Sequence, residues 1–133
     1  GGNRMIINVN GGGGKTNTKV IKIACTNSNQ LTLPYTVTLG FKPTWIVSSG
    51  YQNTSGGGRS YAEINKNNER TFNNPGNYTS AATYEPYVIT TITDDGFQLV
   101  SNPNMSYSAY SSFYGNALIS AGDGDVPEIL TLS

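Results

Sequence analysis

The residues of this chain that could do recognition chemistry are tyrosines set among asparagine, serine and glycine. There are nine tyrosines, and several lie in the loop-like stretches 51–58, 72–84 and 102–114. A tyrosine ring can stack on the apolar face of a sugar, and short amides can hydrogen-bond its hydroxyl groups. The alternative for each ring is that it covers the end of the fold or an oligomer contact. The pattern predicts a ligand site at Tyr51, Asn77, Tyr78, Tyr107, Tyr110 and Tyr114.

The chain offers little for hydrolytic catalysis. It has no histidine, which excludes both a Ser-His-Asp triad and a Cys-His pair. A glycosidase needs two carboxylates about 5 to 10 Å apart across a cleft. Glu63, Glu69 and Glu85 lie near the loop-rich stretches, but the sequence does not place any two of them together. We therefore expect a protein that is not an enzyme.

Two motifs suggest a phosphate or a metal ion, and each has a simpler interpretation. The stretch GGGGKT at 11–16 lacks the first glycine of a phosphate-binding loop, since Val9 stands there, so we interpret it as a flexible turn. In GDGDVPE, Asp123, Asp125 and Glu128 could face one calcium ion, but the twelve-residue spacing of a calcium loop is missing. We interpret this stretch as a polar turn and predict no metal and no cofactor.

The composition restricts the partners. Only 12% of the residues are charged, where about 25% is usual, and eight basic residues balance eight acidic ones. Nucleic acids and anionic membranes select clustered Lys and Arg, so neither is expected as a partner. The sequence contains no run of 18 apolar residues, so no membrane-spanning helix is expected. The single cysteine, Cys25, cannot form an internal disulfide and is expected to be a small buried hydrophobe.

The elements that must position these residues are predicted to be strands. From Leu31 to Leu39 every second residue is apolar, which indicates one strand with alternate faces. Pro34 has no N–H to give to a ladder and places this strand at an edge or a bulge. Gly40 and Pro43 predict a corner. A second strand at 44–48 then puts Trp45 and Val47 on one face and Ile46 on the other.

Further strands are expected at 4–10, 19–25, about 59–64, 87–93, 97–100, 113–121 and 128–132. Residues 50–58 and 65–82 are predicted to be loops, the second being the longest. Asp94-Asp95-Gly96 predicts a hairpin in which Asp-Gly supplies the positive φ angles. Eight or nine short strands without a helix predict an all-β, antiparallel sandwich of jelly-roll type. We expect one domain over 1–133, with residues 1–3 a scar or linker.

Three stretches carry a family resemblance: TVTLGFKPTWIVSSG at 36–50, TTITDDGFQLV at 90–100 and YGNALISAG at 114–122. A strand that ends in Gly-Phe-Lys-Pro, an aromatic-aliphatic strand, an Asp-Gly-Phe hairpin and a final strand of small residues resemble the C-terminal domains of bacteriophage tail fibre, tail-tip and baseplate proteins. The resemblance spans roughly residues 31–122. The usual family ending is Y.YIA.G, from which YGNALISAG differs. The shared motifs are structural, so they assign no functional residue.

The resemblance implies a β-sandwich, often trimeric, that recognises cell-surface glycans or teichoic acids or builds the tail. We therefore expect a non-enzymatic attachment module for a cell-surface glycan, located in a virion tail or on an extracellular surface and forming a homo-oligomer, most plausibly a trimer. One alternative is a purely structural tail domain that binds only neighbouring subunits. Another is a secreted bacterial carbohydrate-binding or adhesin module.

Overall fold

The computed structural model describes residues 5–7, 16–54, 57–73, 86–104, 110–126 and 130–132, and these contain twelve strands and no helix. No helix in this part of the chain is long and apolar enough to cross a membrane. The strands are β1 (Met5–Ile7), β2 (Thr18–Cys25), β3 (Leu31–Thr32), β4 (Tyr35–Thr38), β5 (Trp45–Thr54), β6 (Gly57–Lys66), β7 (Glu69–Asn73), β8 (Val88–Thr93), β9 (Gly96–Ser101), β10 (Ser112–Phe113), β11 (Gly115–Gly122) and β12 (Leu130–Leu132).

All the strand pairs are antiparallel, so the predicted all-β, antiparallel class is confirmed. The larger sheets have the orders β2-β11-β5-β6-β7 and β4-β9-β8, and two small sheets pair β1 with β12 and β3 with β10. The early strands therefore pair with the late ones in reverse order. The predicted number of eight or nine strands is too low, because two-residue strands such as β3 and β10 are too short to show an alternation of apolar and polar residues.

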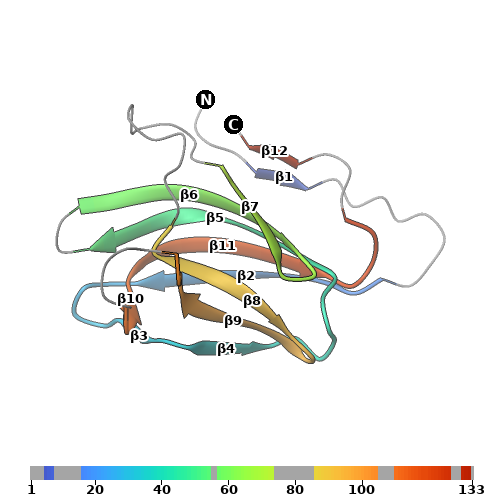
Figure 1. Cartoon of the computed structure of the whole chain (residues 1–133), viewed down its shortest axis with the longest axis horizontal. Helices are drawn as coiled ribbons and strands as arrows, with labels where there is room; N and C mark the ends of the chain where they lie inside the picture. The colour runs from blue at the N-terminus through green and yellow to red at the C-terminus, as the bar shows by residue number, and fades with distance from the viewer. Residues whose placement is uncertain are drawn as a thin grey trace.

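The two larger sheets share one core. Ile46, Ala117 and Ile119 from the five-stranded sheet meet Phe97 and Leu99 from the three-stranded sheet. Figure 1 shows β4, β9 and β8 on one side of the strands β2, β11 and β5. Burial of apolar side chains between two sheets is the main stabilising contribution in such a sandwich.

The alternation in 31–39 is confirmed as a burial pattern but not as one strand. Leu39 is buried, and Leu33 and Val37 pack against the core, whereas Thr36 and Thr38 are exposed. Tyr35 departs from this pattern with 37% exposure. The chain bends at 33–34, so the single strand predicted for 31–39 is wrong and becomes two: β3 pairs only with β10, and β4 pairs only with β9. The predicted edge position is confirmed for β4.

The corner after Gly40 leads into β5 as predicted, but β5 is much longer than 44–48. Trp45 and Val47 lie on one face and Ile46 on the other, and all three are buried. The predicted loop at 50–58 is wrong over residues 50–54 and 57–58, which belong to the β5–β6 hairpin. Gly50 lies within β5, and glycine is required at this position because a Cβ there would lie 2.1 Å from the carbonyl oxygen of Asn116 on β11. Glycine in this stretch therefore permits close strand approach.

The loop predicted at 65–82 is wrong in its first part. Asn67 and Asn68 have φ angles of 51° and 66° and form the tight turn between β6 and β7. Asparagine tolerates this left-handed conformation better than other non-glycine residues, which makes Asn-Asn a hairpin signal. The strand β7 therefore adds an outer strand to the five-stranded sheet.

The β8–β9 hairpin is confirmed, but the reason given for its glycine is wrong. Asp94 and Asp95 form the turn, and neither they nor Gly96 is among the described residues with positive φ. A Cβ at Gly96 would lie 2.0 Å from the carbonyl oxygen of Val37 on β4. This glycine is required by the contact between β9 and β4, not by the turn.

Candidate functional site

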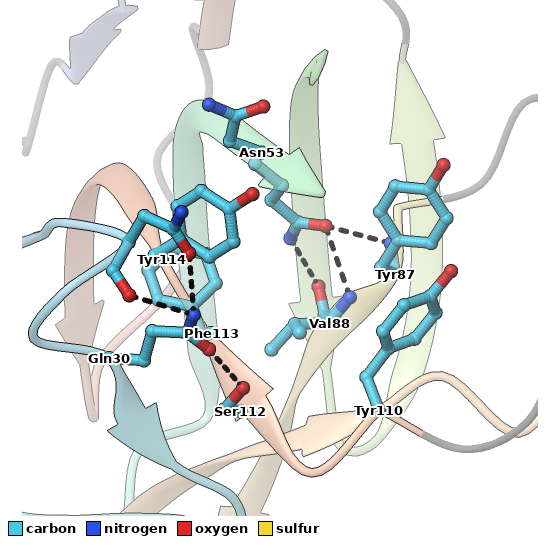
Figure 2. A pocket seen from close by; sticks show the side chains of 10 residues that line it. Gln30, Asn53, Tyr87, Val88, Tyr110, Ser112, Phe113 and Tyr114 are labelled. Atoms are coloured by element: carbon cyan, nitrogen blue, oxygen red, sulfur yellow. Dashed lines mark hydrogen bonds between the residues drawn. The ribbon is translucent and has the colours of Figure 1, made fainter. Parts of the chain in front are cut away.

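A pocket of about 230 Å³ opens where β5 ends, β8 begins and β10 crosses between the sheets. Its walls come from four parts of the chain that are far apart in sequence: the turn after β2, the end of β5, the start of β8 and the segment 110–114. Figure 2 shows Tyr87 and Tyr110 on one side, Phe113 and Tyr114 on the other, and Val88 between them. The lining residues are Asn27, Gln30, Gln52, Asn53, Tyr87, Val88, Tyr110, Ser112, Phe113 and Tyr114.

The floor of the pocket is apolar and rigid. Val88 and Phe113 are 4% and 3% exposed, and Gln52 is 1% exposed. The Gln52 amide uses its polar atoms inside the protein: Nε2 donates to the carbonyl oxygen of Val88 at 2.8 Å, and Oε1 accepts from the N–H groups of Tyr87 at 2.7 Å and Val88 at 3.1 Å. These bonds attach the start of β8 to β5 (Figure 2). A buried amide satisfied in this way fixes the backbone beneath the pocket.

Tyr87 is held from both sides. Its N–H donates to Gln52, and its carbonyl oxygen accepts from the N–H of Asn102 at 2.8 Å. The Asn102 side chain is buried and donates to the carbonyl oxygen of Pro86 at 2.9 Å. The Tyr87 and Tyr110 ring centroids lie 4.7 Å apart with the planes inclined at 59°, a favourable aromatic geometry. The N–H of Tyr110 donates to the Ser101 hydroxyl at 2.9 Å. The two rings therefore form a preorganised wall.

The rim is polar. Gln30 Nε2 donates to the backbone oxygen and to Oδ1 of Asn27, both at 3.0 Å, and Gln30 Oε1 accepts from the Ser112 hydroxyl. The N–H of Asn53 donates to the carbonyl oxygen of Tyr114 at 3.1 Å. Asn27, Gln30 and Asn53 are exposed. Within the described residues no hydrogen-bond partner is found for the side-chain amide of Asn53, the Nδ2 of Asn27 or the hydroxyl of Tyr114.

The structure brings two of the six predicted site residues together. Tyr110 and Tyr114 both line the pocket. Tyr51 does not, because it lies within β5, opposite Asn116, and points to the sheet face away from the core with 42% exposure. Asn77, Tyr78 and Tyr107 lie outside the described residues. For these four the binding role stays a prediction.

Sequence reasoning missed most of the remaining lining residues. The sequence predicts Tyr87 at the start of a strand, and no local pattern indicates that its ring lines a pocket. Gln52 and Asn53 were assigned to a loop, although they end a strand. Nothing local marks Gln52 as a floor residue, since its partners are 35 and 36 positions away in the sequence. The Asn27–Gln30 turn carried a usable signal in its run of short polar residues.

Glu63 is a buried carboxylate on β6, opposite Ser48 on β5. It accepts hydrogen bonds from the Thr90 hydroxyl at 2.8 Å and the Thr90 N–H at 3.2 Å, and contacts Ser48 at 3.3 Å. Arg70 Nε lies 3.6 Å from Glu63 Oε1. Burial raises the pKa of Glu63 from 4.5 to about 7, and the bonds to Thr90 and the Arg70 charge oppose this rise. Burial also raises the pKa of the Tyr61 phenol, and the Glu63 charge adds to that effect.

Of the considered glycosidase carboxylates, the two that lie in the described residues, Glu63 and Glu69, do not form a surface pair. The Glu63 side chain is 0% exposed and so cannot reach a ligand in solvent. Glu69 is exposed at the start of β7, and Glu85 lies outside the described residues. Glu63 is therefore a structural group linking β6, β7 and β8.

The other considered sites are accounted for where they are described. The Asp123 carboxylate accepts from the side chain and the backbone N–H of Asn17 at 2.8 and 2.7 Å, and these bonds lower its pKa. Asp125 is exposed, and Glu128 and residues 11–15 lie outside the described residues. No group of three His, Cys, Asp or Glu in the described ranges could hold a metal ion. Cys25 is half-buried against the core, and burial raises its thiol pKa.

Comparison with known proteins gave no relative: no family model, no curated protein and no solved structure matches this chain significantly.

Proposed function

We propose that this domain is an attachment module that binds a cell-surface glycan in the pocket between β5, β8 and β10. The observation that carries the proposal is the combination of three tyrosine rings and a phenylalanine with exposed amides in one pocket. Aromatic rings stack on the apolar faces of sugars, and amide groups pair with their hydroxyls. The preorganisation of Tyr87 and Tyr110 reduces the entropy lost on binding.

The setting we propose is a virion tail or a similar surface assembly, as the resemblance to phage tail domains implies. The strand connectivity supports a jelly roll, which is a long antiparallel hairpin wrapped into two sheets. β1 pairs with β12, β2 with β11, β3 with β10 and β4 with β9, which is the nested order of such a wrapped hairpin. The β6–β7 pair continues the series, and β5 and β8 face each other through Gln52.

The test is a pull-down of the domain on purified cell-wall and capsular polysaccharides, followed by single substitutions. Tyr110→Ala and Tyr114→Ala should each weaken binding several-fold, because a stacked ring contributes roughly 1 kcal/mol. Tyr35→Ala is the matched control: it removes an exposed ring on β4 that does not line the pocket. Binding should also change little between about 0.05 and 0.5 M salt, since no ion pair is involved.

Two results would contradict the proposal. One is the absence of binding to every envelope preparation by the folded domain. The other is loss of binding with Tyr35→Ala and not with Tyr114→Ala, which would place the site outside this pocket.

A second candidate function, a purely structural tail domain, is favoured by a separate observation. Val20, Tyr51 and Leu118 are 64%, 42% and 41% exposed, and the strand register puts all three on the outer face of β2, β11 and β5. Exposed apolar side chains gathered on one sheet face often mark a protein contact. A domain that binds no glycan but assembles through this face would support the structural role.

A further inference from the structure

We propose that the pocket accepts one neutral sugar residue and that this sugar carries a methyl group, which enters first and rests against Val88 and Phe113. This inference rests on the proposed function and specifies its ligand. The shared chemistry is that of 6-deoxyhexoses and of N-acetylated hexosamines, both of which present a methyl group on an otherwise polar ring. The size of the pocket, its charge and the position of its polar groups support this choice of ligand.

The size limits the ligand to one ring. The pocket holds about 230 Å³, below the roughly 300–1,000 Å³ of sites that enclose drug-sized molecules. A single pyranose ring is of the right scale, whereas several linked rings would have to leave the pocket. The recognised unit is therefore a terminal or branching sugar, and adding further residues to the chain should contribute little.

The charge of the lining selects a neutral ligand. None of the ten described lining residues is charged. A carboxylate or phosphate bound between Tyr87, Tyr110 and Phe113 would lose water without meeting an opposite charge, which is unfavourable. The carboxylate of Glu63, which is buried in the core, has no exposed side-chain surface and pairs with Thr90 and Arg70.

The distribution of polar groups sets the orientation. At the floor, both polar atoms of the Gln52 amide are already bonded to the backbone of Tyr87 and Val88, so the floor offers a ligand mainly the apolar surfaces of Val88 and Phe113. Sugar hydroxyls placed there would lose hydrogen bonds to water. The polar groups without a partner in the described residues lie at the rim, on the exposed Asn27 and Asn53 and on the half-buried Tyr114. An apolar group fits the floor, and the hydroxyls fit the rim.

The experiment titrates the whole chain with free monosaccharides, which carry no methyl aglycone, and measures dissociation constants by ligand-observed NMR. Matched pairs differ only in the methyl group or its carrier: D-fucose with D-galactose, L-rhamnose with L-mannose, and N-acetylglucosamine with glucose. Burying one methyl group corresponds to about a fourfold gain in affinity. We expect at least one methyl-bearing sugar to bind about fourfold or more tightly than its partner, and the pair that responds identifies the source. Glucuronic acid should bind about tenfold or more weakly than glucose.

Variants connect the preference to the pocket. Tyr114→Phe removes one rim hydroxyl and should weaken binding of the preferred sugar several-fold, whereas Tyr35→Phe, on β4 and outside the pocket lining, should leave it unchanged. Equal affinity within all three pairs, equal binding of the uronic acid, or no binding of any monosaccharide overturns the inference. Affinity that rises as the oligosaccharide is lengthened would also overturn the single-sugar inference, while leaving the proposed function intact. Absence of polysaccharide binding would remove both.

Discussion

At the scale of single residues, the pocket depends on side chains that fix the backbone as much as on side chains that face the ligand. Gln52 joins β5 to Tyr87 and Val88, where β8 begins. Asn102 bonds to the same segment, at the carbonyl oxygens of Pro86 and Tyr87. Tyr87 therefore presents its ring from a backbone with both polar groups satisfied. Such support is what keeps an aromatic wall in place when no ligand is bound.

The Gln52→Met substitution tests this role. Methionine matches the length of glutamine but leaves the N–H groups of Tyr87 and Val88 without their buried acceptor. Each unsatisfied buried group costs about 1–3 kcal/mol, so the loss of the acceptor for two N–H groups should lower the free energy of unfolding by roughly 2–6 kcal/mol in urea denaturation. Gln98→Met is the control, since Gln98 donates to Thr36 in an exposed pair at 3.0 Å and its loss should change stability by less than about 0.5 kcal/mol. Equal effects of the two substitutions would refute the supporting role of Gln52.

At the scale of elements, the sequence predicted strands well where one face is apolar and poorly where both faces are packed or polar. The alternation in 35–39 and the β8–β9 hairpin follow from local side chains. The stretch 50–58 looked like a loop because of its glycines, yet Gly50 is dictated by the carbonyl of Asn116, a residue 66 positions away. The pocket could not be predicted as a unit for the same reason: Tyr110 and Tyr114 carried a visible signal, but their partners are brought in by sheet pairing.

The connection between β6, β7 and β8 passes through Glu63, which predicts a pH dependence of stability. Because burial raises the folded-state pKa from 4.5 to about 7, the folded chain binds more protons than the unfolded chain between these values. Stability must therefore fall as pH rises from about 4.5 to about 7, with a slope of up to roughly 1.4 kcal/mol per pH unit from this group.

Urea denaturation of the domain across that pH range measures this effect. The Glu63→Gln variant should lose this part of the pH dependence, because its side chain does not titrate. Glu69→Gln, at the exposed start of β7, should keep it. A Glu63→Gln profile that parallels the unmodified protein would show that Glu63 does not titrate in this range.

At the scale of the whole molecule, the two candidate contacts occupy different surfaces. The pocket lies at the end of the sandwich, whereas Val20, Tyr51 and Leu118 occupy the outer face of the five-stranded sheet. A glycan site and an oligomer contact can therefore be present in one domain without competing. Several copies held together would also raise the apparent affinity of a shallow, weak sugar site through multivalency.

We accordingly predict that the domain self-associates, most plausibly as a trimer, through this outer face. The β2 edge carries Lys19 and Lys22, which disfavour continued strand pairing there, so a face contact through Val20, Leu118 and Tyr51 is the better route, with Lys22 on the same face opposite Leu118. Leu118→Lys should release a 14.2 kDa monomer in light scattering at micromolar concentration, because it replaces an apolar side chain of the contact with a second positive charge beside Lys22. Tyr35→Ser is the control, since Tyr35 is 37% exposed but lies on β4. An unmodified protein that is monomeric, or an oligomer unaffected by Leu118→Lys, would rule out this contact.

Glycan binding per chain should survive in the monomer while retention on a polysaccharide surface declines, because avidity is lost and the pocket is intact.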